Sequence, residues 1–240
     1  MSLAQATATM RIFGKCFDVA TSAADVARSK EMQREWNAEK RRRRTKALSV
    51  IRAFSDRLDN VTLSVALNAI DQCCSAEGSD NRLSTLLSLI EDAHSKLFWP
   101  ALIRNWSGCD DTWRTTTRLL GAMQAHERFP RQGFYSEEQR VFYDSLPDSV
   151  EVFRGCSLPR LRGISWTTDR AISESFARGH RSIRVPEPVV ASAVIPKKEI
   201  FFVATDRQES EIVLNPDRLR KIRTLYAQQF SALERRDSPD

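Results

Sequence analysis

The sequence lacks several features that would assign it to a class at once. Its 240 residues include eight glycines and nine prolines, too few for a collagen-like or low-complexity chain. No apolar run approaches the roughly 20 residues of a membrane-spanning helix. A secretion signal would begin with a charged segment followed by an apolar one, and the N-terminus has no such pattern. We therefore expect a cytoplasmic protein with no membrane partner.

Potential metal ligands are also few and scattered. The five cysteines contain no Cys-x-x-Cys pair, and the three histidines lie far apart in the chain. Neither set has the spacing of a zinc site or a redox centre. We expect no metal, and cysteines that serve as small apolar residues in a reducing compartment.

The remaining composition is that of a globular protein, with 41% hydrophobic and 28% charged residues. The net charge of +6 is concentrated in residues 28–46, which hold nine basic and three acidic residues. This segment includes Arg41, Arg42, Arg43 and Arg44. Such a run forms a solvated helix face, a contact for nucleic acid or an acidic partner protein, or a nuclear targeting signal. Residues 154–184 hold a second excess, seven arginines against two acids.

The hydrophobic period changes near Pro147. Apolar residues before it recur at helical spacing, whereas short β-rich segments separated by proline or polar turns follow it. We predict strands at 150–153, 164–168, 189–195, 200–204, 212–214 and 222–226. One helix interrupts them, capped by Asp169 and ending near Arg178.

This segregation predicts an α+β fold. We expect a helical region over 1–146, with a basic helix at about 28–58 followed by a helical bundle. It packs on a mixed β-sheet over 147–230, and a polar tail follows at 231–240. Three roles are open to the helical region: a layer on the sheet, a substrate-docking domain or a surface for a neutralising partner. We favour the layer, because its apolar stripes need burial.

Three motifs in the strand-rich part combine a cation, hydroxyl groups and carboxylates: Phe153-Arg154-Gly155, Ser165-Trp166-Thr167 and Glu209-Ser210-Glu211. Strand alternation places Ser165 and Thr167 on one face. If the backbone is extended, it also aligns Glu209 with Glu211, about 6–7 Å apart. We expect these groups to converge on one cleft.

In this order the motifs resemble the ADP-ribosyltransferase superfamily, in the Arg–Ser–Glu class that contains bacterial mono-ADP-ribosylating toxins. The resemblance covers the last third of the chain. It departs from the family at Trp166, where a small polar residue is usual, and at Thr167, where serine is usual. It implies a sheet core of ADP-ribosyltransferase type and an NAD-dependent transferase, a glycosyltransferase that uses NAD as its substrate.

The resemblance implies three catalytic residues. NAD loses nicotinamide through an oxocarbenium-like species, as glycosides lose their leaving groups. Glu211 would bond the ribose 2′-hydroxyl and stabilise that positive charge. Ser165 would orient Glu211, and Glu209 would position or deprotonate the acceptor. The alternative is that the two acids are solvated residues beside a strand.

Four further residues would bind NAD. Arg154 suits the diphosphate because its planar guanidinium forms two hydrogen bonds and stays charged; the alternative is a surface ion pair. The main chain of Gly155 would hold the nicotinamide amide. Thr167 would support the site, and Phe176 is either core or a wall for the nicotinamide. We expect His180 to be exposed rather than an acid–base group.

The acceptor stays open between two classes. In this family, a glutamate two positions before the catalytic one accompanies transfer to protein arginine. The basic segments instead suit RNA or DNA, and some relatives in toxin–antitoxin systems for antiviral defence modify RNA. Such an effector would have an antitoxin or chaperone partner. The alternative function is a non-enzymatic nucleic-acid-binding or scaffold protein that uses the basic helix.

Overall fold

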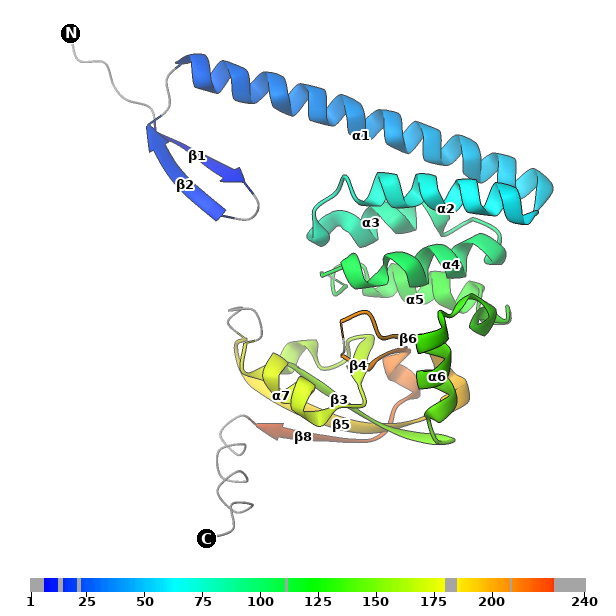
Figure 1. Cartoon of the computed structure of the whole chain (residues 1–240). Helices are drawn as coiled ribbons and strands as arrows, with labels where there is room; N and C mark the ends of the chain where they lie inside the picture. Colours follow the sequence, from blue (N-terminus) through cyan, green and yellow to red (C-terminus); the bar gives the residue numbers. More distant parts are fainter. Residues whose placement is uncertain are drawn as a thin grey trace.

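The computed structural model describes residues 7–12, 15–20, 23–110, 112–179, 185–207 and 209–226. Within these ranges the chain forms seven α-helices, a two-stranded antiparallel pair and a six-stranded sheet. Figure 1 shows the helices stacked in layers over the sheet. The predicted α+β fold is confirmed.

The first six helices are α1 (Ala23–Arg57), α2 (Asn60–Cys74), α3 (Ser79–Ile90), α4 (Ser95–Asn105), α5 (Thr116–Ala125) and α6 (Glu137–Ser145). The basic helix α1 packs on α2 through its C-terminal half, where Ala47, Ile51 and Phe54 are buried. Its residues 30–38 are exposed, and Figure 1 shows this half extending past the other helices. No helix in the described ranges is both long and apolar enough to cross a bilayer.

We had expected helices throughout the N-terminal part, but its first described residues form strands. Strands β1 (Thr7–Ile12) and β2 (Lys15–Ala20) form an antiparallel pair before α1. The absence of glycine and proline after Lys15 favoured helix. Threonine, valine, isoleucine and phenylalanine in these two segments favour strand instead, and pairing between them decides the outcome.

The large sheet contains β3 (Ser149–Ser157), β4 (Ser165–Thr167), β5 (Pro188–Pro196), β6 (Ile200–Ala204), β7 (Glu211–Leu214) and β8 (Arg220–Tyr226). Each corresponds to a predicted strand. Their order is β6-β7-β4-β3-β5-β8, and every described pair is antiparallel, so the expected mixed sheet is wrong. Helix α7 (Arg170–Ala177) joins β4 to β5, and these two strands lie on opposite sides of β3. The strands that the helix connects are therefore not adjacent, so the helical connection gives no parallel pair.

The helices and the sheet share one hydrophobic cluster. Trp99 of α4 is fully buried, with its ring centroid 6.3 Å from that of Phe201 and 6.5 Å from that of Phe202 in β6. Arg131 is buried at the same junction, where it donates hydrogen bonds to the main-chain oxygens of Phe201 and, at 2.6 Å, Ile200. The helical region is thus a layer packed on the sheet.

Helix α7 begins where the sequence predicted, because the Asp169 side chain accepts hydrogen bonds from the main-chain N–H groups of Ala171 at 2.8 Å and Ile172 at 3.3 Å. It packs across β3 at Gly155. A Cβ at Gly155 would overlap the main-chain oxygen of Ser173. The missing side chain therefore makes room for the helix.

We expect Gly155→Ala to lower the free energy of unfolding by about 1–3 kcal/mol, because the methyl group forces α7 off the sheet. Gly121→Ala is the matched control. Gly121 lies in α5 with open space where a Cβ would be, so alanine there should stabilise the helix by about 0.5–1 kcal/mol. Denaturant titration measures both. A Gly155→Ala variant as stable as the wild type would contradict the packing of α7 on β3.

Candidate active site

Three of the predicted site residues meet on the adjacent strands β3, β4 and β7. Ser165 donates a hydrogen bond from Oγ to Oε1 of Glu211. Arg154 donates one from Nη1 to the main-chain oxygen of Ser165. Arg154 and Glu211 are therefore linked through Ser165, the first to its main-chain oxygen and the second to its hydroxyl, across three strands.

The carboxyl group of Glu211 is held in a partly buried position. Burial raises its pKa above the ordinary range, and the negative charge of Glu209 acts in the same direction. Hydrogen bonds from Ser165 and from the side chain of Trp106 act against this, because they stabilise the ionised form. Within the described residues, Glu211 forms no ion pair.

Arg154 is fixed by main-chain oxygens rather than by an acid. Its Nε donates to the main-chain oxygen of Arg160 at 3.3 Å. The guanidinium also lies against Gly163, where a Cβ would overlap it. In the part of the chain that the structure describes, Arg154 forms no ion pair, so it is not the surface pair considered above. A half-buried cation without a carboxylate partner suits an anionic ligand.

Thr167 links two segments of the site. Its Oγ1 donates to the main-chain oxygen of Glu209 at 2.6 Å and accepts from the main-chain N–H of Asp169 at 3.0 Å. The side chain is buried, with 6% of its surface exposed. It therefore holds the end of β4 to the loop before β7.

The geometry of the two glutamates differs from the predicted alternation. Strand β7 begins at Glu211, and Ser210 before it has a left-handed φ of 44°. The backbone from Glu209 to Glu211 is therefore not extended, and alternation cannot place their side chains on one face. The Ser210 main-chain oxygen accepts from Thr168 at 3.2 Å, which stabilises this turn.

Two further predictions concern α7 and its surroundings. Phe176 is half-buried on α7, where the choice between core residue and nicotinamide wall stays a prediction. His180, which we expected to be exposed, lies outside the described residues.

The sequence analysis missed two residues that affect Glu211. The side chain of Trp106, in the short 3-10 helix Trp106–Gly108 after α4, lowers the pKa of the Glu211 carboxyl group. Arg207, in the β6–β7 loop, lowers the same pKa through its positive charge, donates to the main-chain oxygen of Ser107 and lies 3.4 Å from Oδ1 of Asp110. No local sequence pattern identifies either residue as a neighbour of Glu211.

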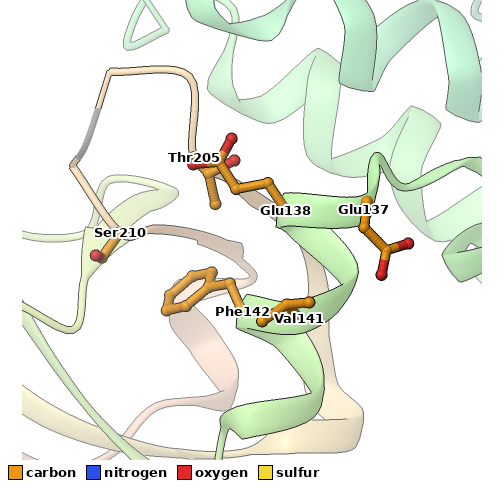
Figure 2. A pocket seen from close by; sticks show the side chains of 6 residues that line it. All are labelled: Glu137, Glu138, Val141, Phe142, Thr205 and Ser210. Carbon is orange, nitrogen blue, oxygen red and sulfur yellow. The ribbon is translucent and has the colours of Figure 1, made fainter.

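A pocket of about 680 Å³ opens between α6 and the β6–β7 loop. Figure 2 shows Glu138 and Phe142 on the side of α6 that faces this loop. The described residues that line the pocket are Glu137, Glu138, Val141, Phe142, Thr205 and Ser210. Ser210 directly precedes Glu211 in the chain, but Arg154, Ser165 and Glu211 are not among the residues that line this pocket.

The basic run of α1 is divided between packing and solvent. Arg43 bonds the main-chain oxygen of Gln72 at 3.1 Å, and Arg44 bonds Oγ of Ser88 at 2.7 Å, so these two tie α1 to α2 and α3. Arg42 is exposed and pairs with Glu39. Arg41 is exposed. The four arginines therefore do not form one solvated contact surface.

No protein family, curated protein or solved structure matches the chain. Among the described residues, no group of three or more histidine, cysteine, aspartate or glutamate side chains is placed to hold a metal ion.

We expect Glu211→Gln to stabilise the protein at neutral pH. The raised folded pKa of Glu211 favours folding at low pH, and this contribution is lost as the pH rises through that pKa. The gain in melting temperature should be small near pH 4, grow toward neutrality and then level off. It should amount to about 2–4 °C for each kcal/mol relieved.

The matched control is Glu151→Gln, which changes an exposed carboxylate on β3. Thermal melts of both variants and the wild type across pH 4–8 measure the difference. A Glu211→Gln gain that is the same at both ends of this range would contradict burial of the Glu211 charge.

Proposed function

We propose that the chain is an NAD-dependent mono-ADP-ribosyltransferase that transfers ADP-ribose to a protein or nucleic-acid acceptor. The observation that carries this proposal is the linkage of Arg154, Ser165 and Glu211 across three adjacent strands. These are the three residue types that the resemblance requires, in the required order, and they meet at one site.

The reaction divides into two bond changes. Nicotinamide leaves with the electron pair of its glycosidic bond, and positive charge develops on the ribose. The ionised carboxylate of Glu211 stabilises that charge and accepts a hydrogen bond from the 2′-hydroxyl. A nucleophile on the acceptor then attacks the ribose carbon and loses its proton, for which Glu209 is the available base.

We place the nicotinamide beside the main chain of Gly155. In the described register, β3 pairs with β4 at Phe153 and Thr167, whereas β3 continues to Ser157 with β5 on its other side. Main-chain groups of Gly155 on the β4 side are thus outside that pairing and suit the nicotinamide amide. Arg154, beside it, suits the diphosphate.

Two features bear on the acceptor in opposite ways. Among the described residues, the lining of the pocket beside Ser210 includes Glu137 and Glu138 and no basic side chain, which favours a cationic acceptor such as protein arginine. Arg41 and Arg42, exposed on α1, favour a nucleic acid. Arg43 and Arg44 weaken the second argument, because they bond within the helical layer.

We expect Glu211→Gln to slow nicotinamide release from NAD by about 10²–10³-fold, the loss typical of removing one preorganised electrostatic group. Glu209→Gln is the matched control. It should release nicotinamide at near the wild-type rate but transfer less ADP-ribose to the acceptor. Nicotinamide release and acceptor labelling are measured separately. An unchanged release rate in Glu211→Gln would exclude the proposed mechanism.

The acceptor class is tested with labelled NAD, the purified chain and a cell lysate. Label removed by protease but not by nuclease identifies a protein, and the reverse identifies a nucleic acid. The non-enzymatic alternative predicts no NAD consumption, together with nucleic-acid binding that weakens steeply with salt.

A further inference from the structure

Trp166 is the residue of the Ser165-Trp166-Thr167 motif to which the sequence assigns no role in the reaction. Strand alternation places its side chain on the opposite face of β4 from its two hydroxyl neighbours, and 2% of its surface is exposed. Its indole Nε1 donates a hydrogen bond to the main-chain oxygen of Gly163 at 2.8 Å, and this bond is buried. The indole therefore holds the main chain at Gly163 in place.

Gly163 in turn lies against the guanidinium of Arg154. A Cβ at Gly163 would overlap Nη2, Cζ and Nε of that side chain. The φ of Gly163 does not lie in the left-handed region, so the backbone conformation does not require glycine here. The requirement is for space, because the missing side chain lets the main chain approach the flat guanidinium.

The segment 160–165 contacts the guanidinium of Arg154 at three places. The main-chain oxygen of Arg160 accepts a hydrogen bond from Nε at 3.3 Å, and the main-chain oxygen of Ser165 accepts one from Nη1. Gly163 lies between these two positions in the chain and packs against the same group. The hydrogen bond from the indole thus fixes the middle of the segment that holds the guanidinium.

The direction of the guanidinium matters for an anionic ligand. Its five N–H groups lie in one plane at fixed angles, so a rotation of the group changes which of them face the ligand. Two of them bond main-chain oxygens in this structure. These neutral contacts orient Arg154 without a carboxylate that would compete with a phosphate for its positive charge.

We propose that Trp166 is a positioning residue for Arg154. Its N–H keeps Gly163 against the guanidinium, and this contact fixes the direction in which Arg154 meets the diphosphate of NAD. The inference rests on the proposed function, since it concerns the arginine to which that function assigns the diphosphate. It gives Trp166 a task that a buried apolar residue without an N–H could not perform.

The first test compares Trp166→Phe with Trp99→Phe. Phenylalanine keeps an aromatic ring at each position and removes the N–H. Trp99 is the matched control because it is also buried and donates from Nε1 to a main-chain oxygen, that of His126 at 3.0 Å.

Trp166→Phe should raise KM for NAD by about 3–10-fold, the value of one neutral hydrogen bond. Its kcat should stay near that of the wild type, because the diphosphate is bound equally in the ground state and the transition state. Trp99→Phe should lower the melting temperature and leave KM unchanged. A loss of kcat at unchanged KM in Trp166→Phe would contradict the positioning role.

The second test changes Gly163 itself. Gly163→Ala should raise KM for NAD at least as much as Trp166→Phe does, because the methyl group displaces the guanidinium of Arg154. Gly133→Ala is the matched control, since a Cβ at Gly133 would meet open space. An unchanged KM in a folded Gly163→Ala variant would overturn the proposal. Melting temperatures show whether each variant is folded, and Trp166→Phe decides the question if Gly163→Ala is not.

An independent test needs no activity. In protein labelled with ¹⁵N-arginine, the Nε–H signal of Arg154 is identified by its loss in Arg154→Lys. The bond to the main-chain oxygen of Arg160 should slow the exchange of this proton with water. Exchange should be faster in Trp166→Phe and unchanged in Trp99→Phe, because only the first loosens the segment that holds Nε.

The outcomes separate the two proposals. If the wild-type chain neither binds nor consumes NAD, the proposed function fails, and the exchange of the Arg154 proton still decides whether Trp166 positions that side chain. If NAD is consumed but Trp166→Phe matches Trp99→Phe in KM, only the inference about Trp166 fails. Unchanged exchange in Trp166→Phe overturns that inference in either case.

Discussion

A buried carboxylate must be hydrogen-bonded or paired, and the arrangement around Glu211 satisfies this requirement. Ser165 supplies a donor from the neighbouring strand, and the side chain of Trp106, from the helical layer, also favours the ionised form. Neither carries a charge. The carboxylate is therefore held in place without an ion pair that would neutralise it, which leaves its negative charge available to a cation that forms during a reaction.

Packing between the two layers also reaches the surroundings of Glu211. Without the helices, β6 would expose Phe201 and Phe202. The shared hydrophobic cluster includes Trp106, which packs edge-on against Phe202 and whose side chain lowers the pKa of Glu211. Packing in the core thus affects the ionisation of a polar group at its edge.

Local sequence signals were sufficient for much of the fold. Alternation, capping and turn residues predicted the six strands, the Asp169 cap and the order of the three motifs. Each depends on neighbours within a few positions. The Arg154–Ser165–Glu211 linkage could be anticipated because the motifs lie at or beside strands, and strands place side chains at fixed intervals.

The remaining features depend on long-range contacts or on backbone conformations that the sequence does not mark. The left-handed φ of Ser210 overturned the alternation argument for Glu209 and Glu211, and serine carries no signal for it. The bond from Arg207 to Ser107 and the effect of Trp106 on the pKa of Glu211 join residues about 100 positions apart. Which of the four arginines from Arg41 to Arg44 are exposed depends on the face of α1 that α2 and α3 cover.

The central claim is that Arg154, Ser165 and Glu211 surround one dinucleotide. A crystal structure of the chain with a non-cleavable NAD analogue tests it most directly. The account predicts the diphosphate within hydrogen-bond distance of the Arg154 guanidinium and the nicotinamide ribose 2′-hydroxyl on the Glu211 carboxylate. An analogue bound away from both side chains, or no binding at concentrations that saturate other NAD-dependent enzymes, would contradict it.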